Sequence, residues 1–386
     1  MVLAVLGGGL LVLGLVAVAT GILPAADAAA LGERIAPVLG FVVAITVVAA
    51  IAAEAGLFDR LASIAARLAR GRGALLWVLV VLVAVASTVF LSLDTTAVLL
   101  TPVVVTLARR VGLSPIPFAM TTVWLANTGS LLLPVSNLTN LLAESDPAFG
   151  AAYLARSWLP ATVAVLVPVA ILAVVSRKAL AHRYTAPTAE AIEDRVLFGI
   201  AAVVVALLVP ALALGEPLLH IPVWVPAAVA AVVLVGAAAV RRPHALSIRL
   251  LPVPLVLFVC GLFLAVTALG RLGLTEVLTA AAGTGGGPLD LLRLAGVGTV
   301  TANLADNLPA YLALEPVAGT EQRLLALLVA VNAGPLITPW ASLATLLWHA
   351  RLSALEVRIS WWRFAGLGLI AAPLTVGLAT LAILLT

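Results

Sequence analysis

Asparagine is rare in this chain, and every copy falls in one of three short segments of an otherwise apolar sequence. The copies are Asn127, Asn137, Asn140, Asn303, Asn307 and Asn332. Two aspartates, Asp94 and Asp306, stand in similarly apolar surroundings. Amide and carboxyl groups are costly in lipid, so where they occur they usually bind a solute, an ion or a proton. These residues therefore predict a polar binding site inside a membrane.

The composition indicates a membrane protein. Of 386 residues, 63% are hydrophobic and 10% are charged, whereas about 25% of the residues of a soluble domain are charged. A net charge of +4 and a pI near 10.0 would fit a nucleic-acid partner in a soluble protein. Here the basic residues lie in short loops between apolar runs, where they set the topology. We therefore expect a lipid bilayer, and no nucleic acid, as the partner.

Few residues could hold a metal or a cofactor. Cys260 is the only cysteine, which excludes an intramolecular disulfide and a multi-cysteine metal site. The four histidines are scattered without the spacing of ligands. No nucleophile–base pair and no His/Asp/Glu constellation lies within the apolar runs. The sequence therefore predicts no enzyme, no catalytic residue, no metal and no cofactor.

Nine apolar runs are long enough to cross a bilayer, at about 20 residues each. They are residues 2–22, 35–56, 117–142, 153–176, 195–215, 222–240, 250–270, 323–348 and 364–385. The first run resembles a signal peptide but lacks a basic N-terminal region, so we expect a retained span. The sequence predicts an all-α polytopic membrane protein with about nine full crossings.

Two further apolar regions, 75–108 and 288–316, do not fit as crossings. A single helix over the first would be about 51 Å long, and two full spans need about 40 residues. We therefore predict two re-entrant hairpins, each returning to the side from which it entered. With the N-terminus inside, sixteen of the 21 Lys and Arg residues lie in the cytoplasm and five outside, which follows the positive-inside rule. The C-terminus is then outside the inner (cytoplasmic) membrane.

Two polar segments match each other without a gap: NTGSLLLPVSNLTNLL (127–142) and NAGPLITPWASLATLL (332–347). Seven of sixteen positions are identical, among them the pairs Asn127/Asn332, Gly129/Gly334 and Pro134/Pro339. Each segment follows one hairpin, whose tips read LDTTA (93–97) and DNLPA (306–310). The copies lie in the third and the eighth predicted crossings, five apart, and an odd separation inverts their orientation. Inverted repeats with interrupted helices are typical of secondary transporters.

The chain therefore divides into two repeats. The first is 1–176, with hairpin 75–108 and broken helix 117–142; a loop and connecting span follow at 177–221; the second is 222–386, with hairpin 288–316 and broken helix 323–348.

We expect the binding site where the two tips and the two broken helices meet. The candidate solute- or ion-binding residues are Asp94, Thr95, Thr96, Asn127, Ser136 and Asn137 from the first repeat, and Asn303, Asp306, Asn307, Asn332, Thr338 and Ser342 from the second. Asp94 and Asp306 are also the candidate proton carriers, because buried acids in transporters commonly relay protons. Alternatively, Asp94 only caps the second hairpin arm through the amides of Thr96 and Ala97.

Five stretches carry a resemblance to a known family. They are GLFDRLASIAARLARGRG (56–73), LDTTAVLLTP (93–102), NTGSLLLPVSNLTNLL (127–142), DNLPAYL (306–312) and GPLITPWASLATLLW (334–348). In these the chain resembles the arsenical pump membrane protein family, within the ion transporter superfamily, from about residue 35 onward. The resemblance implies arsenite and antimonite efflux driven by proton exchange, sometimes with a cytosolic ATPase partner. It favours Asp94, which matches the tip acid of that family, as the proton carrier.

Two alternatives from the same superfamily stay open: a sodium/proton antiporter, and a transporter of anions such as dicarboxylates or sulfate. The arsenical pump family commonly has Asp where Asn127 and Asn332 stand, and Lys where Leu336 stands. This chain therefore carries fewer charges near the expected site. Neutral arsenous acid suits a site lined by Asn, Ser and Thr.

Overall fold

The computed structural model describes the chain except residues 1, 147–148, 150–152, 186–191, 220 and 248–249. Helices dominate the described part, and its only strand-like pairing is an isolated bridge between Arg72 and Arg183. A backbone in lipid must satisfy its own hydrogen bonds, which helices do. The all-α prediction is confirmed. Arg249 of the charge count, and residues 186–191 and 220 between the repeats, lie outside the described residues.

The first half of the chain contains nine α-helices and three short 3₁₀ or π-helical segments (η) in its described part. They are α1 (Val2–Ala19), α2 (Ala25–Glu54), α3 (Leu57–Leu68), α4 (Gly73–Leu91), α5 (Leu93–Thr95), η1 (Thr96–Leu100), α6 (Thr101–Arg110), α7 (Pro115–Thr128), η2 (Gly129–Leu131), η3 (Pro134–Ser136), α8 (Leu138–Glu144) and α9 (Tyr153–Leu180).

The second half repeats the same kinds of element. Its described helices are α10 (Arg195–Leu219), α11 (Trp224–Arg241), η4 (Pro243–Ala245), α12 (Val253–Leu269), η6 (Gly270–Leu274), α13 (Thr275–Ala282), α14 (Pro288–Leu304), α15 (Asn307–Ala318), α16 (Glu321–Ala333), η7 (Pro339–Ala341), α17 (Leu343–Ala354), α18 (Trp361–Ala382) and η8 (Ile383–Leu385).

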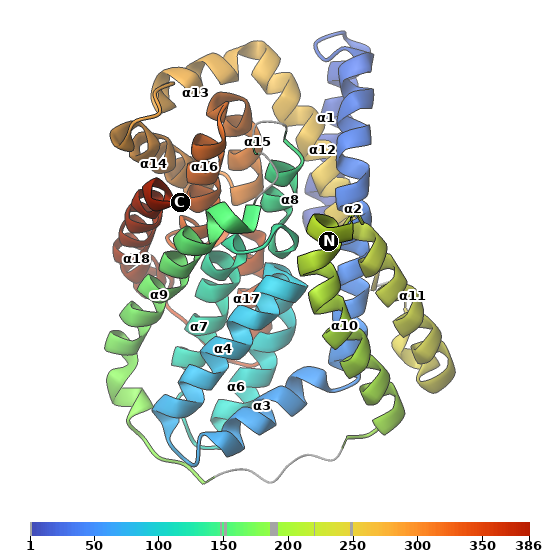
Figure 1. Cartoon of the computed structure of the whole chain (residues 1–386), viewed down its shortest axis with the longest axis vertical. Coiled ribbons are helices and arrows are strands. Elements are labelled where there is room, and N and C mark those ends of the chain that lie inside the picture. The colour runs from blue at the N-terminus through green and yellow to red at the C-terminus, as the bar shows by residue number, and fades with distance from the viewer. Residues whose placement is uncertain (1, 147–148, 150–152, 186–191, 220, 248–249) are drawn as a thin grey trace.

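Both predicted hairpins and both predicted broken helices are present. The first hairpin consists of α4 and the continuous run α5, η1 and α6, and the second consists of α14 and α15. The first broken helix is α7 with α8, and the second is α16 with α17. Figure 1 shows α4 and α6 extending from the lower end toward the centre, and α14 and α15 doing so from the upper end. The two repeats therefore have opposite orientations, as the paired segments predict.

Seven stretches of the described part are long and apolar enough to cross a membrane: α2, α4, α9, α10, α11, α12 with α13, and α18. All but α4, which belongs to the first hairpin, correspond to predicted spans. The shorter apolar helix α1 and the two broken helices account for the remaining predicted spans. A hairpin returns the chain to the same end whatever its depth, so the length of α4 does not change the orientation of later loops. The count of nine full crossings stays a prediction.

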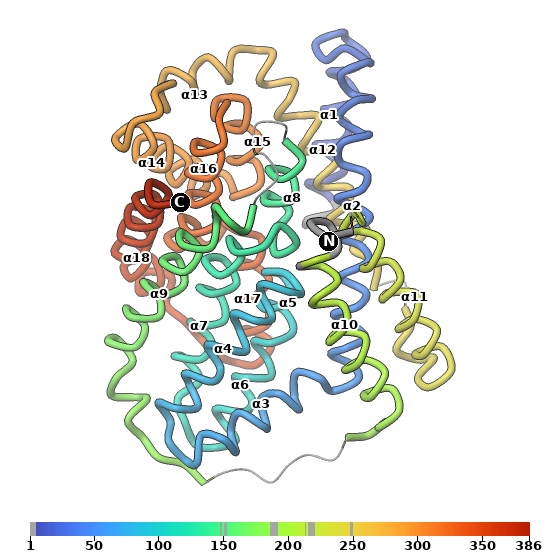
Figure 2. Tube along the Cα trace, in the orientation of Figure 1, coloured from blue at the N-terminus to red at the C-terminus, as the bar shows by residue number. Residues whose placement is uncertain are grey.

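Two groups of helices lie side by side, as Figures 1 and 2 show. One contains α1, α2, α10, α11 and α12, and the other contains both hairpins and both broken helices. Glycines let α1 approach α12 closely: a Cβ atom at Gly7 would lie 2.6 Å from the backbone nitrogen of Phe258. Small residues at helix contacts are the usual means of close packing in membranes. The helices α1 and α12 of the first group are therefore closely packed beside the hairpin tips.

Charged side chains gather at the two ends of the molecule. Near the end of α6, Arg109 donates to the carbonyl oxygen of Leu355 (2.7 Å), and Arg242, which follows α11, donates to that of Glu54 (3.4 Å). Three ion pairs connect other elements: Arg34–Glu315 joins α2 to α15, Arg156–Glu321 joins the start of α9 to the start of α16, and Arg271–Asp27 joins η6 to the start of α2. The predicted crossings place Arg109 and Arg242 on one side of the membrane and Arg34, Arg156 and Arg271 on the other. The structure separates the two sets in the same way. Which end faces the cytoplasm stays a prediction.

The two hairpin tips share an unusual backbone conformation. Ser92 has φ 99° and ψ 160°, and Asp306 has φ 156° and ψ 159°, a region that is nearly reserved for glycine. Each residue also caps the arm that follows: Ser92 Oγ accepts from the amide of Thr95 (3.4 Å), and Asp306 Oδ1 accepts from that of Leu308 (3.1 Å). The alternative that Asp94 caps the second arm of the first hairpin is wrong, because Ser92 holds that position.

The strain at the first tip predicts an effect on stability. Ser92→Gly should raise the free energy of unfolding by roughly 1 kcal/mol, because glycine adopts this backbone region without strain. Ser92→Ala keeps the strain and loses the capping oxygen, so it should lower that free energy. Unfolding of the full chain in detergent measures both. A glycine variant less stable than the alanine variant would contradict the assignment of strain.

Candidate functional site

Both broken helices are interrupted at corresponding residues. Leu133 (φ −123°, ψ 149°) and Thr338 (φ −102°, ψ 149°) are extended, and each precedes a proline that opens a short 3₁₀ turn. The chain is extended again at Asn137 (φ −150°) and Ser342 (φ −149°), where the next helix begins. Leu133 and Thr338, and likewise Asn137 and Ser342, are separated by the same number of residues as Asn127 and Asn332. The predicted breaks in both repeats are confirmed.

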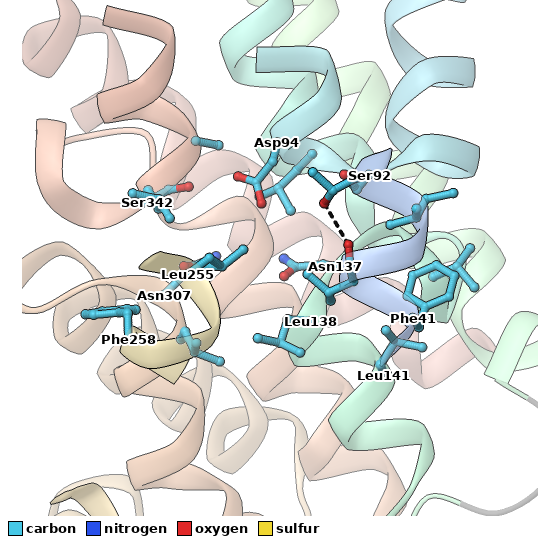
Figure 3. A pocket seen from close by; sticks show the side chains of 18 of the residues that line it. Phe41, Ser92, Asp94, Asn137, Leu138, Leu141, Leu255, Phe258, Asn307 and Ser342 are labelled. Atoms are coloured by element: carbon cyan, nitrogen blue, oxygen red, sulfur yellow. Dashed lines mark hydrogen bonds between the residues drawn. The ribbon is translucent and has the colours of Figure 1, made fainter. Parts of the chain in front are cut away.

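A cavity of about 70 Å³ lies where the two tips and the two breaks meet. Its polar lining is Thr46 from α2, Ser92 and Asp94 from the first tip, Asn137 from the first break, Asp306 and Asn307 from the second tip, and Ser342 from the second break. Figure 3 shows Asp94, Asn137, Asn307 and Ser342 arranged around a common centre. Phe41 of α2 and Phe258 of α12 contribute to the apolar side.

Five of the twelve predicted site residues therefore line this cavity, namely Asp94, Asn137, Asp306, Asn307 and Ser342. The other seven, Thr95, Thr96, Asn127, Ser136, Asn303, Asn332 and Thr338, lie around it without forming its surface. Their hydrogen bonds, described below, hold the lining residues in place.

Helix N-termini surround the two carboxyl groups of the cavity. Two carboxyl groups and no Lys or Arg are among its described lining residues. Four helical segments begin there, with Ser92, Asn137, Asp306 and Ser342 as their N-terminal residues. A helix N-terminus carries roughly half a positive charge, less for a short helix, so these ends offset part of the charge of two carboxylates. The cavity therefore suits a neutral or cationic solute better than a dianion.

Asn332 joins the two repeats at their centre. Its Oδ1 accepts from Ser130 Oγ (2.5 Å) and from Asn137 Nδ2 (2.6 Å), and its Nδ2 donates to Asn140 Oδ1 (2.8 Å). Asn332 is fully buried, as are Ser130 and Asn140. Asn140 in turn donates to the carbonyl oxygens of Ser130 and Leu133 in the break, the second of which also accepts from the amide of Ser136. Asn332 thus fixes Asn137 at the edge of the cavity.

Asn303 connects the second hairpin to the second break by similar hydrogen bonds. Its Nδ2 donates to the carbonyl oxygen of Gly334 (2.9 Å), and its Oδ1 accepts from the amide of Thr338 (3.0 Å). The Thr338 hydroxyl and the Trp340 indole both donate to the Asn303 carbonyl oxygen. A single side chain therefore satisfies both a donor and an acceptor that the broken helix exposes.

Hydroxyl groups close the first hairpin. Thr96 Oγ1 lies 2.9 Å from both Ser87 Oγ and Thr88 Oγ1, which stand on the other arm. Thr95 Oγ1 donates to the carbonyl oxygen of Leu91 (2.8 Å), and Ser136 Oγ donates to that of Val89 (2.9 Å). The Ser136 bond joins the first break to the first hairpin. This network holds Ser92 and Asp94 against the cavity.

Sequence reasoning missed several lining residues. Ser92 stands one position before the LDTTA tip, so extending that motif by a residue would have included it. Thr46, Phe41 and Phe258 lie within long apolar spans of α2 and α12, where no pattern distinguishes them from residues that face lipid.

Comparison with known proteins gives one consistent picture. Residues 1–344 match the family model of citrate transporters. The chain is 33% identical over 376 residues to the arsenical pump membrane protein of Escherichia coli (strain K12), covering 89% of this chain and 85% of that protein. The protein of the same name from Yersinia enterocolitica is 32% identical over 369 residues, with the same coverage.

A solved structure shows the same fold. The Alcanivorax borkumensis YdaH transporter, reported to have an unusual topology, matches with a TM-score of 0.60 and 18% identity. The match covers 99% of this chain and 97% of that one. These comparisons confirm the prediction of a multi-span helical membrane transporter.

The central position of Asn332 predicts a large loss of stability on truncation. Asn332→Ala should lower the free energy of unfolding by about 2–4 kcal/mol, because it leaves the buried Asn137 amide without a partner and Asn140 Oδ1 with only the long bond from Thr139 Oγ1 (3.4 Å). Asn307→Ala is the matched control, since that amide faces the cavity. Chemical unfolding in detergent compares the two variants. Equal losses would show that Asn332 is not the joint between the repeats.

Proposed function

This chain belongs to the citrate transporter family and to the arsenical pump membrane protein family, and on that premise we propose that it exports arsenite and antimonite in exchange for protons. The observation that carries this proposal is the polar cavity between two inverted repeats, which has no Lys or Arg among its described lining residues. It is lined by amide, hydroxyl and carboxyl groups, which can bind a small solute rich in hydroxyl groups. Arsenous acid, neutral near pH 7, is such a solute.

The cavity favours such a solute over citrate and over other carboxylates or sulfate. A volume of about 70 Å³ has room for a few water-sized groups. Recognition of carboxylate or sulfate usually employs Arg or Lys, and neither residue is among the described lining residues. A sodium ion is the second candidate, because two carboxyl groups and several side-chain oxygens lie together at the same place.

Asp94 is the proposed proton carrier. Its carboxyl group lines the cavity and forms no hydrogen bond within the described part of the chain. Asp306, by contrast, accepts from the amide of Leu308 and caps α15, which ties its carboxylate to the hairpin. A carboxyl group that makes few fixed contacts can exchange a proton for a solute as the site changes sides. We assign Asp306 to solute binding.

The proposed orientation completes the scheme. The N-terminus lies on the cytoplasmic side of the inner membrane and the C-terminus on the outer side, as the distribution of basic residues indicates. The exchange of solute for protons uses the chain alone, so purified protein in vesicles should transport without a cytosolic ATPase.

Uptake into everted vesicles tests the substrate. Arsenite and antimonite should accumulate when a proton gradient is imposed, whereas citrate and sulfate should not. Sodium uptake that is coupled to protons, with no arsenite uptake, would replace the proposal by the sodium alternative.

Asp94→Asn tests the coupling. The amide keeps the shape of the side chain but cannot carry a proton, so gradient-driven accumulation of arsenite should be lost while arsenite binding persists. Asp27→Asn is the control, because Asp27 pairs with Arg271 at the end of the molecule, away from the cavity. If Asp94→Asn still accumulates arsenite in response to the proton gradient, Asp94 is not the carrier.

A further inference from the structure

Asn127 and Asn332 occupy equivalent places in the two repeats. Asn332 Nδ2 donates to Asn140 Oδ1 (2.8 Å), and Asn127 Nδ2 donates to Thr345 Oγ1 (3.4 Å). Asn140 and Thr345 are themselves a matched pair of the repeat. Each asparagine also donates to a carbonyl oxygen one turn earlier in its own helix, that of Leu328 or Val123. The pseudo-symmetry of the repeats therefore extends to these individual hydrogen bonds.

The bond between Asn137 and Asn332 breaks this symmetry. In one half, Asn137 Nδ2 reaches Asn332 Oδ1 at 2.6 Å. The equivalent residues in the other half are Ser342 and Asn127. Ser342 Oγ and Asn127 Oδ1 are both buried, and neither has a hydrogen-bond partner. A bond that one repeat forms is thus absent from the other, with both of its ends left unpaired.

The difference in side-chain length explains this absence. Serine ends one atom after its Cβ, whereas the asparagine amide extends two atoms beyond it, so a serine at the position equivalent to Asn137 ends one atom short of the reach of that amide. The orientation of the Asn127 amide is set by its two Nδ2 bonds, which leaves Oδ1 as an acceptor. Serine can both donate and accept. The gap between them therefore has the hydrogen-bonding character required by a single hydroxyl group, accepting from one side and donating to the other.

We propose that the gap between Ser342 Oγ and Asn127 Oδ1 is a subsite for one hydroxyl group of the transported solute. Ser342 lines the cavity, and Figure 3 shows its side chain turned toward the cavity centre, so a solute there can reach the gap past Ser342. The solute class is a small neutral molecule with several hydroxyl groups. One hydroxyl donates to Asn127 and accepts from Ser342, while others face Asp94 and Asn307. This subsite rests on the proposed function of the same cavity.

Ser342→Ala tests the subsite without adding bulk. Arsenite affinity, measured by titration calorimetry on the full-length protein in detergent, should fall roughly 5- to 10-fold, the effect of one lost hydrogen bond. Thermal stability without arsenite should not fall, because the hydroxyl removed has no partner in the protein. Arsenite affinity equal to that of the wild type would show that a resident water, rather than the solute, fills the gap, and would overturn the proposal.

Ser342→Asn tests the geometry. The longer amide should reach Asn127 Oδ1 and recreate the bond that Asn137 makes with Asn332, so the variant should unfold at a higher temperature than Ser342→Leu, which matches it in size. Arsenite binding should be lost in both variants. If the asparagine variant is no more stable than the leucine variant, or still binds arsenite, Ser342 and Asn127 do not enclose the subsite.

The wild type separates the two levels of the proposal. A wild-type protein that binds no arsenite overturns the proposed function and the subsite together. Wild-type binding that is unchanged in Ser342→Ala overturns the subsite alone and leaves the proposed function in place.

Discussion

Interrupting a helix inside a membrane frees backbone groups that hydrocarbon cannot satisfy, and this constraint governs the centre of the molecule. Asparagine meets it because its amide donates and accepts at once. Asn140 donates to two carbonyl oxygens of the first break, and Asn303 bonds the carbonyl of Gly334 and the amide of Thr338 at the second. The confinement of asparagine to these segments follows from that requirement rather than from helix packing in general.

The same breaks determine the electrostatics of the cavity. Each interruption starts a new helix near the centre, and each hairpin tip starts another, so the N-terminal residues of four helical segments line one cavity. Their partial positive charges allow two carboxyl groups to stand together without Arg or Lys among the described lining residues. The strained backbone at Ser92 and Asp306 persists because the packed arms on either side fix it, which is common at functional sites.

The sequence predicts the hairpins and broken helices, which form the frame of the site, better than it predicts which side chains line the cavity. The Gly and Pro residues at matched offsets locate both breaks. The two broken helices are five crossings apart in chain order, and this odd separation predicts hairpins that enter from opposite ends. The direction of a side chain is not encoded in this way. Asn137 lines the cavity while Asn140, less than one turn later, faces the backbone of the break. Phe258 of α12 reaches the cavity only through tertiary packing, which the uniform hydropathy of that span does not reveal.

The two repeats agree in their frame and differ where they meet the solute. Asn127 and Asn332, Gly129 and Gly334, and Pro134 and Pro339 are identical pairs, and both asparagines donate to a carbonyl oxygen one turn earlier in their own helix. At the cavity, Val135 lines the surface while its counterpart Trp340 is half-exposed and bonds Asn303. Asn137 likewise corresponds to Ser342. A symmetric frame can adopt two equivalent arrangements that face opposite sides of a membrane, but a single small solute lacks that symmetry. Divergence at the lining positions, with identity at the frame positions, satisfies both requirements in one chain.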